Sequence, residues 1–262
     1  MNNKDILWIF SHKNPTYFPS YVVGGIMPAD KLEIQKIIFL EDHDPNKLLA
    51  KYAPKILIIS KAFHLKIKEL IILAKERNIK VISVFDDWHF METDINKNRL
   101  LFNKYIADHS DQIIVKTLAA SEIIKKYTNH KSIVIPDCIR YESILPIKKI
   151  TYPFNISWFG MHSNHDTIKL AFNEISSTQN ICKINIITNN IEELTNNLSE
   201  YKNVNTIDYK IIKWNKSLDK QIYQSDIIII PYINDQIRYV KSSNRIVDSL
   251  NMGRFVIMSK AK

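Results

Sequence analysis

Four polar residues near the C-terminal end of the sequence are spaced to share one face of a helix: Lys241, Asn244, Arg245 and Asp248. At 100° per residue they form one stripe, and the opposite stripe is apolar. Two cations in the first turn of a helix oppose its macrodipole, at a cost of about 0.3–1 kcal/mol each. The placement becomes favourable when an anion such as a diphosphate lies at the helix start, where backbone N–H groups are free. The spacing therefore predicts an anion-binding helix, with Asp248 accepting hydrogen bonds from ribose hydroxyls. A solvated amphipathic helix would show the same stripe.

A second chemical cluster, Asp86, Asp87 and His89, follows the apolar run Val81–Val84. Carboxylates at the end of a buried strand can accept a proton from a hydroxyl or orient it, and a histidine can assist. We therefore predict that Asp86, Asp87 and His89 are catalytic. A helix N-cap with one solvated aspartate, beside a structural histidine, is the alternative. Two adjacent carboxylates could also begin a metal site, but no third ligand is evident, so we expect neither a metal nor another cofactor.

Glycine is rare in this chain, with four residues where about 18 would be average. Gly24 and Gly25 lie after the first predicted strand, and Gly160 follows the predicted strand Asn155–Trp158. A glycine lets the backbone approach a ligand closely. We predict that each lies where a side chain would obstruct the backbone. A turn before a short helix would equally explain Gly24 and Gly25.

Short Ile- and Val-rich runs alternate with helical patterns along the whole chain, as is typical of parallel strands covered on both faces. The predicted strands of the first half are Ile6–Phe10, Gln35–Leu40, Ile56–Ile59, Val81–Val84, Gln112–Val115 and Ser132–Ile135. Those of the second half are Asn155–Trp158, Lys183–Thr188, a run ending near Lys213, Asp226–Ile230 and Phe255–Met258. The clearest predicted helices are Phe63–Arg77, Lys97–Ala107, Ala119–Tyr127, Thr167–Ile175, Ile191–Leu198, Leu218–Gln224 and Ser243–Met252.

A proline-bearing break over residues 135–153 separates the two halves. The repeated strand–helix pattern on either side predicts an α/β protein with two Rossmann-like domains, residues 1–145 and 146–262, facing each other across a cleft. Ligands of open α/β sheets bind at the carboxyl ends of the strands. We therefore expect the site residues to line that cleft.

The segment 224–257 resembles the donor-binding signature of GT-B glycosyltransferases of the family-4 type, also called group 1. In that signature a strand ending in proline, here Asp226–Pro231, precedes a helix of the form K-x-x-N-R/K-x-x-E-x-x-x-x-G. The matching residues are Lys241, Asn244, Arg245, Asp248 and Gly253, with Asp248 in place of the ribose-binding glutamate.

Other stretches resemble the same family more weakly and in the same order. Residues 107–117 and 135–139 resemble the end of an acceptor-binding domain, and residues 156–160 resemble the strand and glycine that open the donor-binding domain. Ile212–Trp214 resembles the stretch that lines the base pocket. The resemblance implies a donor site formed by Gly24, Gly25, Gly160, His162, Trp214, Lys241, Ser242, Asn244, Arg245 and Asp248.

Two positions depart from the family pattern. The loop Gly160–Asp166 contains no Arg or Lys, where the family holds the diphosphate, so Lys241 and Arg245, with His162, would carry that task. The first of the family's two spaced glutamates falls at Val240, so that sugar-contacting carboxylate is missing. These departures bear on donor identity and on activity.

The resemblance implies transfer of a sugar from a nucleotide-sugar donor to a hydroxyl acceptor, with retention at the anomeric carbon and without a metal. The acceptor would be a glycan or a lipid-linked glycan in cell-surface polysaccharide, lipopolysaccharide or glycolipid synthesis. A GT-B donor domain normally continues beyond the strand that ends at Met258, so we expect an incomplete C-terminal domain.

Composition narrows the alternatives. Hydrophobic residues form 45% of the chain and charged residues 24%, which excludes a disordered chain, and no apolar run approaches the roughly 18 residues of a membrane span. Two cysteines and no signal peptide favour the cytoplasm. The net charge of +9 suits docking at the anionic inner face of the cytoplasmic membrane. A non-catalytic GT-B module that binds a nucleotide or a partner is the second hypothesis. A basic nucleic-acid-binding α/β protein is the third, although no nucleic-acid motif is visible.

Overall fold

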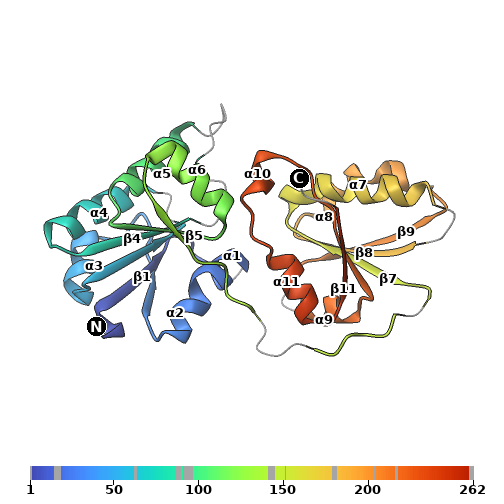
Figure 1. The fold of residues 1–262 in the computed structure, drawn as a ribbon, viewed down its shortest axis with the longest axis horizontal. Coiled ribbons are helices and arrows are strands. Elements are labelled where there is room, and N and C mark those ends of the chain that lie inside the picture. The colour runs from blue at the N-terminus through green and yellow to red at the C-terminus, as the bar shows by residue number, and fades with distance from the viewer. Residues whose placement is uncertain are drawn as a thin grey trace. The chain divides into compact units, whose positions relative to one another are not determined.

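The computed structural model describes residues 2–14, 19–61, 64–85, 90, 97–140, 145–150, 152–178, 182–202, 204–215 and 218–259. The chain forms two compact units, each built on one sheet (Figure 1). The first unit comprises Met1–Cys138 and Tyr239–Ser242, and the second comprises Ile139–Arg238 and Ser243–Lys262. The predicted α/β architecture with two sheets is confirmed.

The first unit contains a six-stranded parallel sheet in the order β2-β1-β3-β4-β5-β6. This is the flavodoxin-like order of doubly wound sheets, extended by one strand. The strands are β1 (Ile6–Phe10), β2 (Gln35–Ile38), β3 (Ile56–Ser60), β4 (Lys80–Phe85), β5 (Gln112–Val115) and β6 (Ser132–Val134).

Helices cover both faces of the first sheet (Figure 1). One face packs on α3 (Pro45–Tyr52), α4 (Lys66–Glu76), α5 (Lys97–Asp108) and α6 (Leu118–Thr128). The other face packs on α1 (Pro19–Tyr21), a π-helical turn at Val22–Ile26 and α2 (Met27–Lys31). Side-chain caps set two of the starts, because Asp44 accepts from the first backbone N–H groups of α3 and Thr117 from that of Ala120 in α6.

The second unit contains a five-stranded parallel sheet in the order β11-β10-β7-β8-β9. Its strands are β7 (Asn155–Phe159), β8 (Cys182–Thr188), β9 (Ile207–Lys213), β10 (Ile227–Ile230) and β11 (Phe255–Met258). Counted within the unit, this is the order 3-2-1-4-5 of the Rossmann fold. The topology therefore reverses between β7 and β10.

The helices of the second unit divide between the two faces of its sheet. α7 (His165–Ser176) and α8 (Ile191–Asn197) share one apolar cluster with the sheet. α9 (Leu218–Gln224) and α11 (Asn244–Asn251) share another. A short helix, α10 (Gln236–Tyr239), precedes α11. The 3-10 turn His162–Asn164 precedes α7, and the 3-10 turn Ser199–Tyr201 follows α8.

A Ser-Asp pair before a central strand recurs in the two units. Ser110 and Asp111 precede β5, where the Asp111 carboxylate accepts from the backbone N–H of Val81 at 2.7 Å and Ser110 lies 2.6 Å from Ser83 Oγ. Ser225 and Asp226 precede β10, where the carboxylate accepts from Asn155 N–H at 2.8 Å and the hydroxyl lies 2.6 Å from Ser157 Oγ. Each serine also donates to the carbonyl four residues earlier, at Ile106 and Gln221 respectively. Each pair thus joins the end of a helix and the starts of two parallel strands.

The start of α11 differs from the prediction that placed Lys241 on its polar stripe. The helix begins at Asn244, so Lys241 and Ser242 lie in irregular structure before it. The preceding residue, Val240, is buried in the core of the first unit, and its carbonyl accepts a hydrogen bond from Thr117 Oγ1. Those contacts hold the segment away from a helical path.

None of the helices in the described ranges is long and apolar enough to span a membrane.

Candidate functional site

The strongest candidate site lies at the carboxyl ends of β7 and β10 in the second unit. The chain leaves these neighbouring strands toward opposite faces of the sheet, which is where open α/β sheets bind ligands. The loop after β7 carries Gly160 and His162, and α11, which follows β10, carries Arg245. The structure thus brings together three of the predicted donor-site residues.

Gly160 allows Arg245 to lie against the end of β7. Arg245 Nη1 donates to the carbonyl oxygen of Phe159 at 3.1 Å. A Cβ atom on Gly160 would lie 3.4 Å from that Nη1 and only 2.8 Å from the Trp158 ring, which is fully buried. The position therefore favours glycine because the buried Trp158 ring already occupies the space that a Cβ would need, while Arg245 lies at ordinary contact distance.

The charge of Arg245 is only partly compensated. Burial, with a smaller contribution from the charge of Arg238, lowers the pKa of the guanidinium to about 10, so it stays protonated at neutral pH although its charge is disfavoured. Within the described ranges it forms no ion pair with a carboxylate. An anion bound at this position would relieve that cost.

Arg238, in contrast, is paired with carboxylates and holds the loop after β7. This buried residue of α10 forms ion pairs with Asp235 and Asp166 and donates to the carbonyl of Ser163. The prediction did not include Arg238, and its sequence context gives no periodic signal that would have found it. Its role here is to fix the loop that carries His162.

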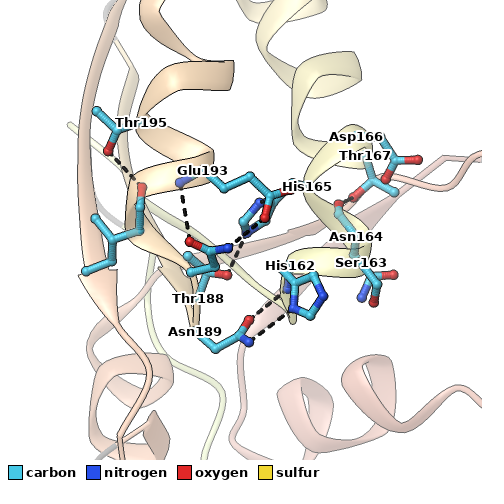
Figure 2. Close-up of polar contacts among 12 residues, drawn as sticks. His162, Ser163, Asn164, His165, Asp166, Thr167, Thr188, Asn189, Glu193 and Thr195 are labelled. Atoms are coloured by element: carbon cyan, nitrogen blue, oxygen red, sulfur yellow. Dashed lines mark hydrogen bonds and ion pairs between the residues drawn. The ribbon is translucent and has the colours of Figure 1, made fainter.

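The end of β8 also holds that loop (Figure 2). Asn189 bonds to His162 at two points: its Oδ1 accepts from the backbone N–H at 2.8 Å, and its Nδ2 lies 3.2 Å from the ring Nδ1. One residue earlier, Thr188 Oγ1 lies 2.7 Å from Nε2 of the buried His165. Burial lowers the pKa of His165, so this ring is neutral at pH 7. Asn189 was not predicted, although a polar residue directly after an apolar strand is the pattern that marks such a position.

Trp214 lies at the carboxyl end of β9, as the base-pocket assignment requires. Its backbone N–H donates to the carbonyl of Thr188 at 2.7 Å, and its half-buried ring lies 6.5 Å from that of Phe159. Asn244 and Asp248 lie on α11 with Arg245 and are half-buried. Binding of a ligand by these three residues remains a prediction.

Lys241 and Ser242 belong to the first unit, with Val240. Val240 is only 3% exposed and packs among apolar side chains, so the position where the family has a glutamate is a core position in this chain. A carboxylate there would be buried.

Gly24 and Gly25 lie in the π-helical turn of the first unit and are buried. A Cβ on Gly25 would lie 2.4 Å from the Phe10 ring. The buried Lys116 donates to the carbonyl of Gly24 at 3.3 Å and lies 3.5 Å from the Asp137 carboxylate. Packing thus explains Gly25, and a ligand role for either glycine stays a prediction.

Asp86, Asp87 and His89, the predicted catalytic residues, lie outside the described residues. In the part of the chain that is described, no group of three His, Cys, Asp or Glu side chains is arranged to hold a metal ion. A pocket of about 830 Å³ opens beside the edge strand β2 and α3, lined by Phe10, His43, Leu48 and Tyr52 among others. It contains none of the predicted site residues.

The sequence matches no protein-family profile and no curated protein. Solved structures, however, align with almost the whole chain. Anabaena Alr3699/HepE in complex with UDP and glucose superposes with a TM-score of 0.66 at 10% sequence identity, over 98% of this chain and 80% of that one. The apo form of the lipopolysaccharide outer core galactosyltransferase WaaB gives 0.58 at 13% identity with the same coverage. A putative UDP-N-acetylglucosamine 2-epimerase from Listeria monocytogenes gives 0.57 at 9% identity, over 98% and 79%.

The chain therefore has the GT-B fold, as the sequence resemblance predicted. At these identities the likeness establishes the fold alone. The similar structures include a transferase and a protein named as a putative epimerase, so the fold does not fix the reaction, which must be argued from the site.

Proposed function

We propose that this protein is a glycosyltransferase that moves a sugar from a nucleotide-sugar donor to a hydroxyl acceptor. The observation that carries the proposal is Arg245, a guanidinium without a carboxylate partner in the described ranges, held by the Phe159 carbonyl at the switch point of a Rossmann-type sheet. A diphosphate is the anion that such a position suits, because guanidinium groups bind phosphate oxygens with two parallel hydrogen bonds.

In the proposed reaction the bond between the anomeric carbon and the diphosphate oxygen breaks while the acceptor oxygen bonds to that carbon. Negative charge develops on the leaving nucleoside diphosphate, and Arg245 stabilises it from a fixed position. The acceptor proton passes to a base, for which Asp86, Asp87 and His89 remain the predicted candidates. The family-4 resemblance favours retention at the anomeric carbon.

We assign the remaining donor-site roles from the family resemblance and from the elements that carry these residues. His162 lies on the loop after β7 and would contact the diphosphate, Trp214 would line the base pocket, and Asp248 would bind the ribose. The solved structure of HepE with UDP and glucose makes uridine diphosphate the first nucleotide to test. We infer a glycan or lipid-linked glycan acceptor, which the name of WaaB supports by analogy of fold.

A second function, nucleotide binding without transfer, is favoured by one observation. Val240 replaces a sugar-contacting carboxylate of the family and is part of the first unit's core. A module of this kind would bind the nucleoside diphosphate and leave the sugar intact.

The donor site is tested first by binding. We expect Arg245→Ala to weaken UDP binding by about 1.5–3 kcal/mol, because it removes charged hydrogen bonds to phosphate. Arg245→Lys should recover only part of that loss, since an ammonium lacks the planar fork. Lys169→Ala is the matched control, because it removes one positive charge from an exposed ion pair on α7 of the same unit. Isothermal titration with UDP, GDP and ADP measures all four proteins.

Equal affinities for Arg245→Ala and Lys169→Ala would overturn the diphosphate assignment. The reaction is then followed by NMR of UDP-sugars incubated with the protein, with and without EDTA. Release of UDP supports transfer or hydrolysis, an epimerised UDP-sugar supports an epimerase, and an unchanged UDP-sugar that still binds supports the non-catalytic module.

A further inference from the structure

His162 and Asn189 form a closed pair at the carboxyl edge of the second sheet (Figure 2). The backbone N–H of His162 can only donate, so the side-chain oxygen of Asn189 must face it, at 2.8 Å. That contact turns the NH₂ group of Asn189 toward the imidazole, where its nitrogen lies 3.2 Å from Nδ1. The orientation of the amide is therefore set by the backbone.

The amide orientation in turn sets the position of the proton on the ring. An NH₂ group can only donate, so Nδ1 of His162 accepts and carries no proton. In the neutral ring the proton is then on Nε2. The exposed ring of His162 thus presents an N–H donor to solvent or to a ligand.

The backbone that carries His162 is fixed on both sides. Gly160 N–H donates to the carbonyl of Ile187 at 3.0 Å, and the carbonyl of Ser163 accepts from Arg238. His162 itself begins a 3-10 turn that leads into α7. The loop that carries the His162 ring is therefore held on both sides, and Arg245 packs against the end of β7, where this loop begins.

We propose that Asn189 is a positioning residue that holds His162 in the Nε2–H tautomer, so that His162 donates a neutral hydrogen bond to a phosphate oxygen of the donor. This inference rests on the proposed function. A neutral N–H donor suits this loop, because Arg245 already places a positive charge at the end of β7 and the His162 ring adds a directional hydrogen bond beside it. The His162–Asn189 pair would thus supply a directional hydrogen bond in a loop that has no Arg or Lys.

The tautomer is measured on the whole protein without any ligand. Two-dimensional ¹H–¹⁵N NMR of the imidazole, recorded at about pH 8, above the usual histidine pKa of about 6.5, distinguishes a protonated Nε2 from a protonated Nδ1. We expect His162 of the wild type to show the Nε2–H pattern. In Asn189→Asp a carboxylate faces Nδ1, so the ring should change to the Nδ1–H tautomer and present a lone pair to the ligand.

UDP is the probe for the second half of the inference. Saturating UDP should shift the Nε2 resonance of wild-type His162, and Asn189→Asp should bind UDP about tenfold more weakly or worse. Asn190→Asp is the matched control: it adds the same charge one residue away, at the N-cap of α8, where an aspartate oxygen can still accept from the Glu193 N–H although the bond from the Asn190 amide to the Glu193 carboxylate is lost. We expect its affinity to stay within about threefold of the wild type.

Two results would count against the inference, and a third would count against the proposed function on which it rests. An Nδ1–H ring or a mixture in the wild type overturns the role of Asn189. UDP binding that leaves the His162 resonances unchanged, with equal affinities for the two variants, overturns the contact to the ligand. A wild type that binds no nucleoside diphosphate refutes the proposed function and with it the contact to a donor phosphate. The role of Asn189 is then judged from the tautomer spectrum alone.

Discussion

Gly160 and Arg245 show how one backbone position can serve packing and binding together. A Cβ on Gly160 would clash with the buried Trp158 ring and would lie in contact with the Arg245 guanidinium. The guanidinium is thereby held at the end of β7 by the Phe159 carbonyl rather than by a carboxylate. The absence of a side chain at Gly160 thus leaves room for the Trp158 ring, with the Arg245 guanidinium packed beside the same position.

We expect Gly160→Ala to disturb both properties. The added methyl group would overpack against Trp158 and cost about 1–3 kcal/mol of the free energy of unfolding. It would also displace Arg245 and weaken UDP binding, measured by titration calorimetry beside urea unfolding. Phe172→Leu, a change in the same apolar core away from the loop, serves as the control that lowers stability alone. If both variants bind UDP equally well, Gly160 has only a packing role.

At the scale of elements, a Ser-Asp pair before a central strand has the same role in both units. Asp111 and Asp226 both precede a strand and accept from the first N–H groups of the neighbouring strand. Each also forms an ion pair, with Lys75 at 2.6 Å and with Lys148 at 2.7 Å. The pairs therefore fix the register of two parallel strands at their amino ends.

This arrangement predicts an acid sensitivity of the second unit. Burial alone would raise the pKa of Asp226, but Lys148, the Asn155 N–H and Arg254 outweigh it, so the pKa lies below the ordinary value. Because the folded state holds the carboxylate ionised more strongly than the unfolded state does, the stabilisation is present above the unfolded pKa of about 3.9. It is lost as the pH falls below that value and through the lower folded pKa.

Urea unfolding between about pH 7 and pH 3 measures the effect. Asp226→Asn should be less stable than the wild type at neutral pH, and the difference should shrink toward the acid end. Glu200→Gln, which breaks an exposed ion pair of the same unit, should change the free energy of unfolding by less than about 1 kcal/mol throughout. A constant difference between Asp226→Asn and the wild type would contradict the role assigned to the ionised carboxylate.

The strands were the part of the fold that the sequence predicted best. Buried parallel strands are apolar almost without interruption, and β1, β5 and β11 have the predicted bounds. The short helices α1, α2 and α10 were not predicted, because elements of three to five residues contain no full period of a helical pattern. Lys241 was misplaced for another reason: the core contact of Val240 overrides a pattern that continues smoothly through the sequence.

The site was predicted in part, for a similar reason. Gly160, His162 and Arg245 were found because spacing and a family pattern point to them. Asn189 lies 27 residues along the chain from its partner His162, and Arg238 lies 75 residues from its partner Ser163. Only the register of the parallel strands and the path of the chain through α10 bring them to the same loop. A single sequence contains no signal for such contacts.

At the scale of the whole molecule, the net charge of +9 favours an anionic partner. We predict binding to vesicles that contain anionic lipid, because each well-placed basic residue contributes about 1 kcal/mol near such a surface. Sedimentation with anionic vesicles should exceed that with neutral vesicles and should fall as salt is added. Binding to random duplex DNA with a steep salt dependence, without vesicle binding, would favour the nucleic-acid hypothesis instead.

The Ser225–Asp226 pair and the candidate site lie at opposite ends of the strands of the second sheet. Asp226 and Ser225 act where β7 and β10 begin, whereas Gly160, His162 and Arg245 gather where those strands end. Substitutions in the loops at the carboxyl edge therefore leave the contacts that set strand register untouched. A chain built in this way can change the ligand that it accepts by exchanging loop residues, while the contacts that set the register of its strands stay in place.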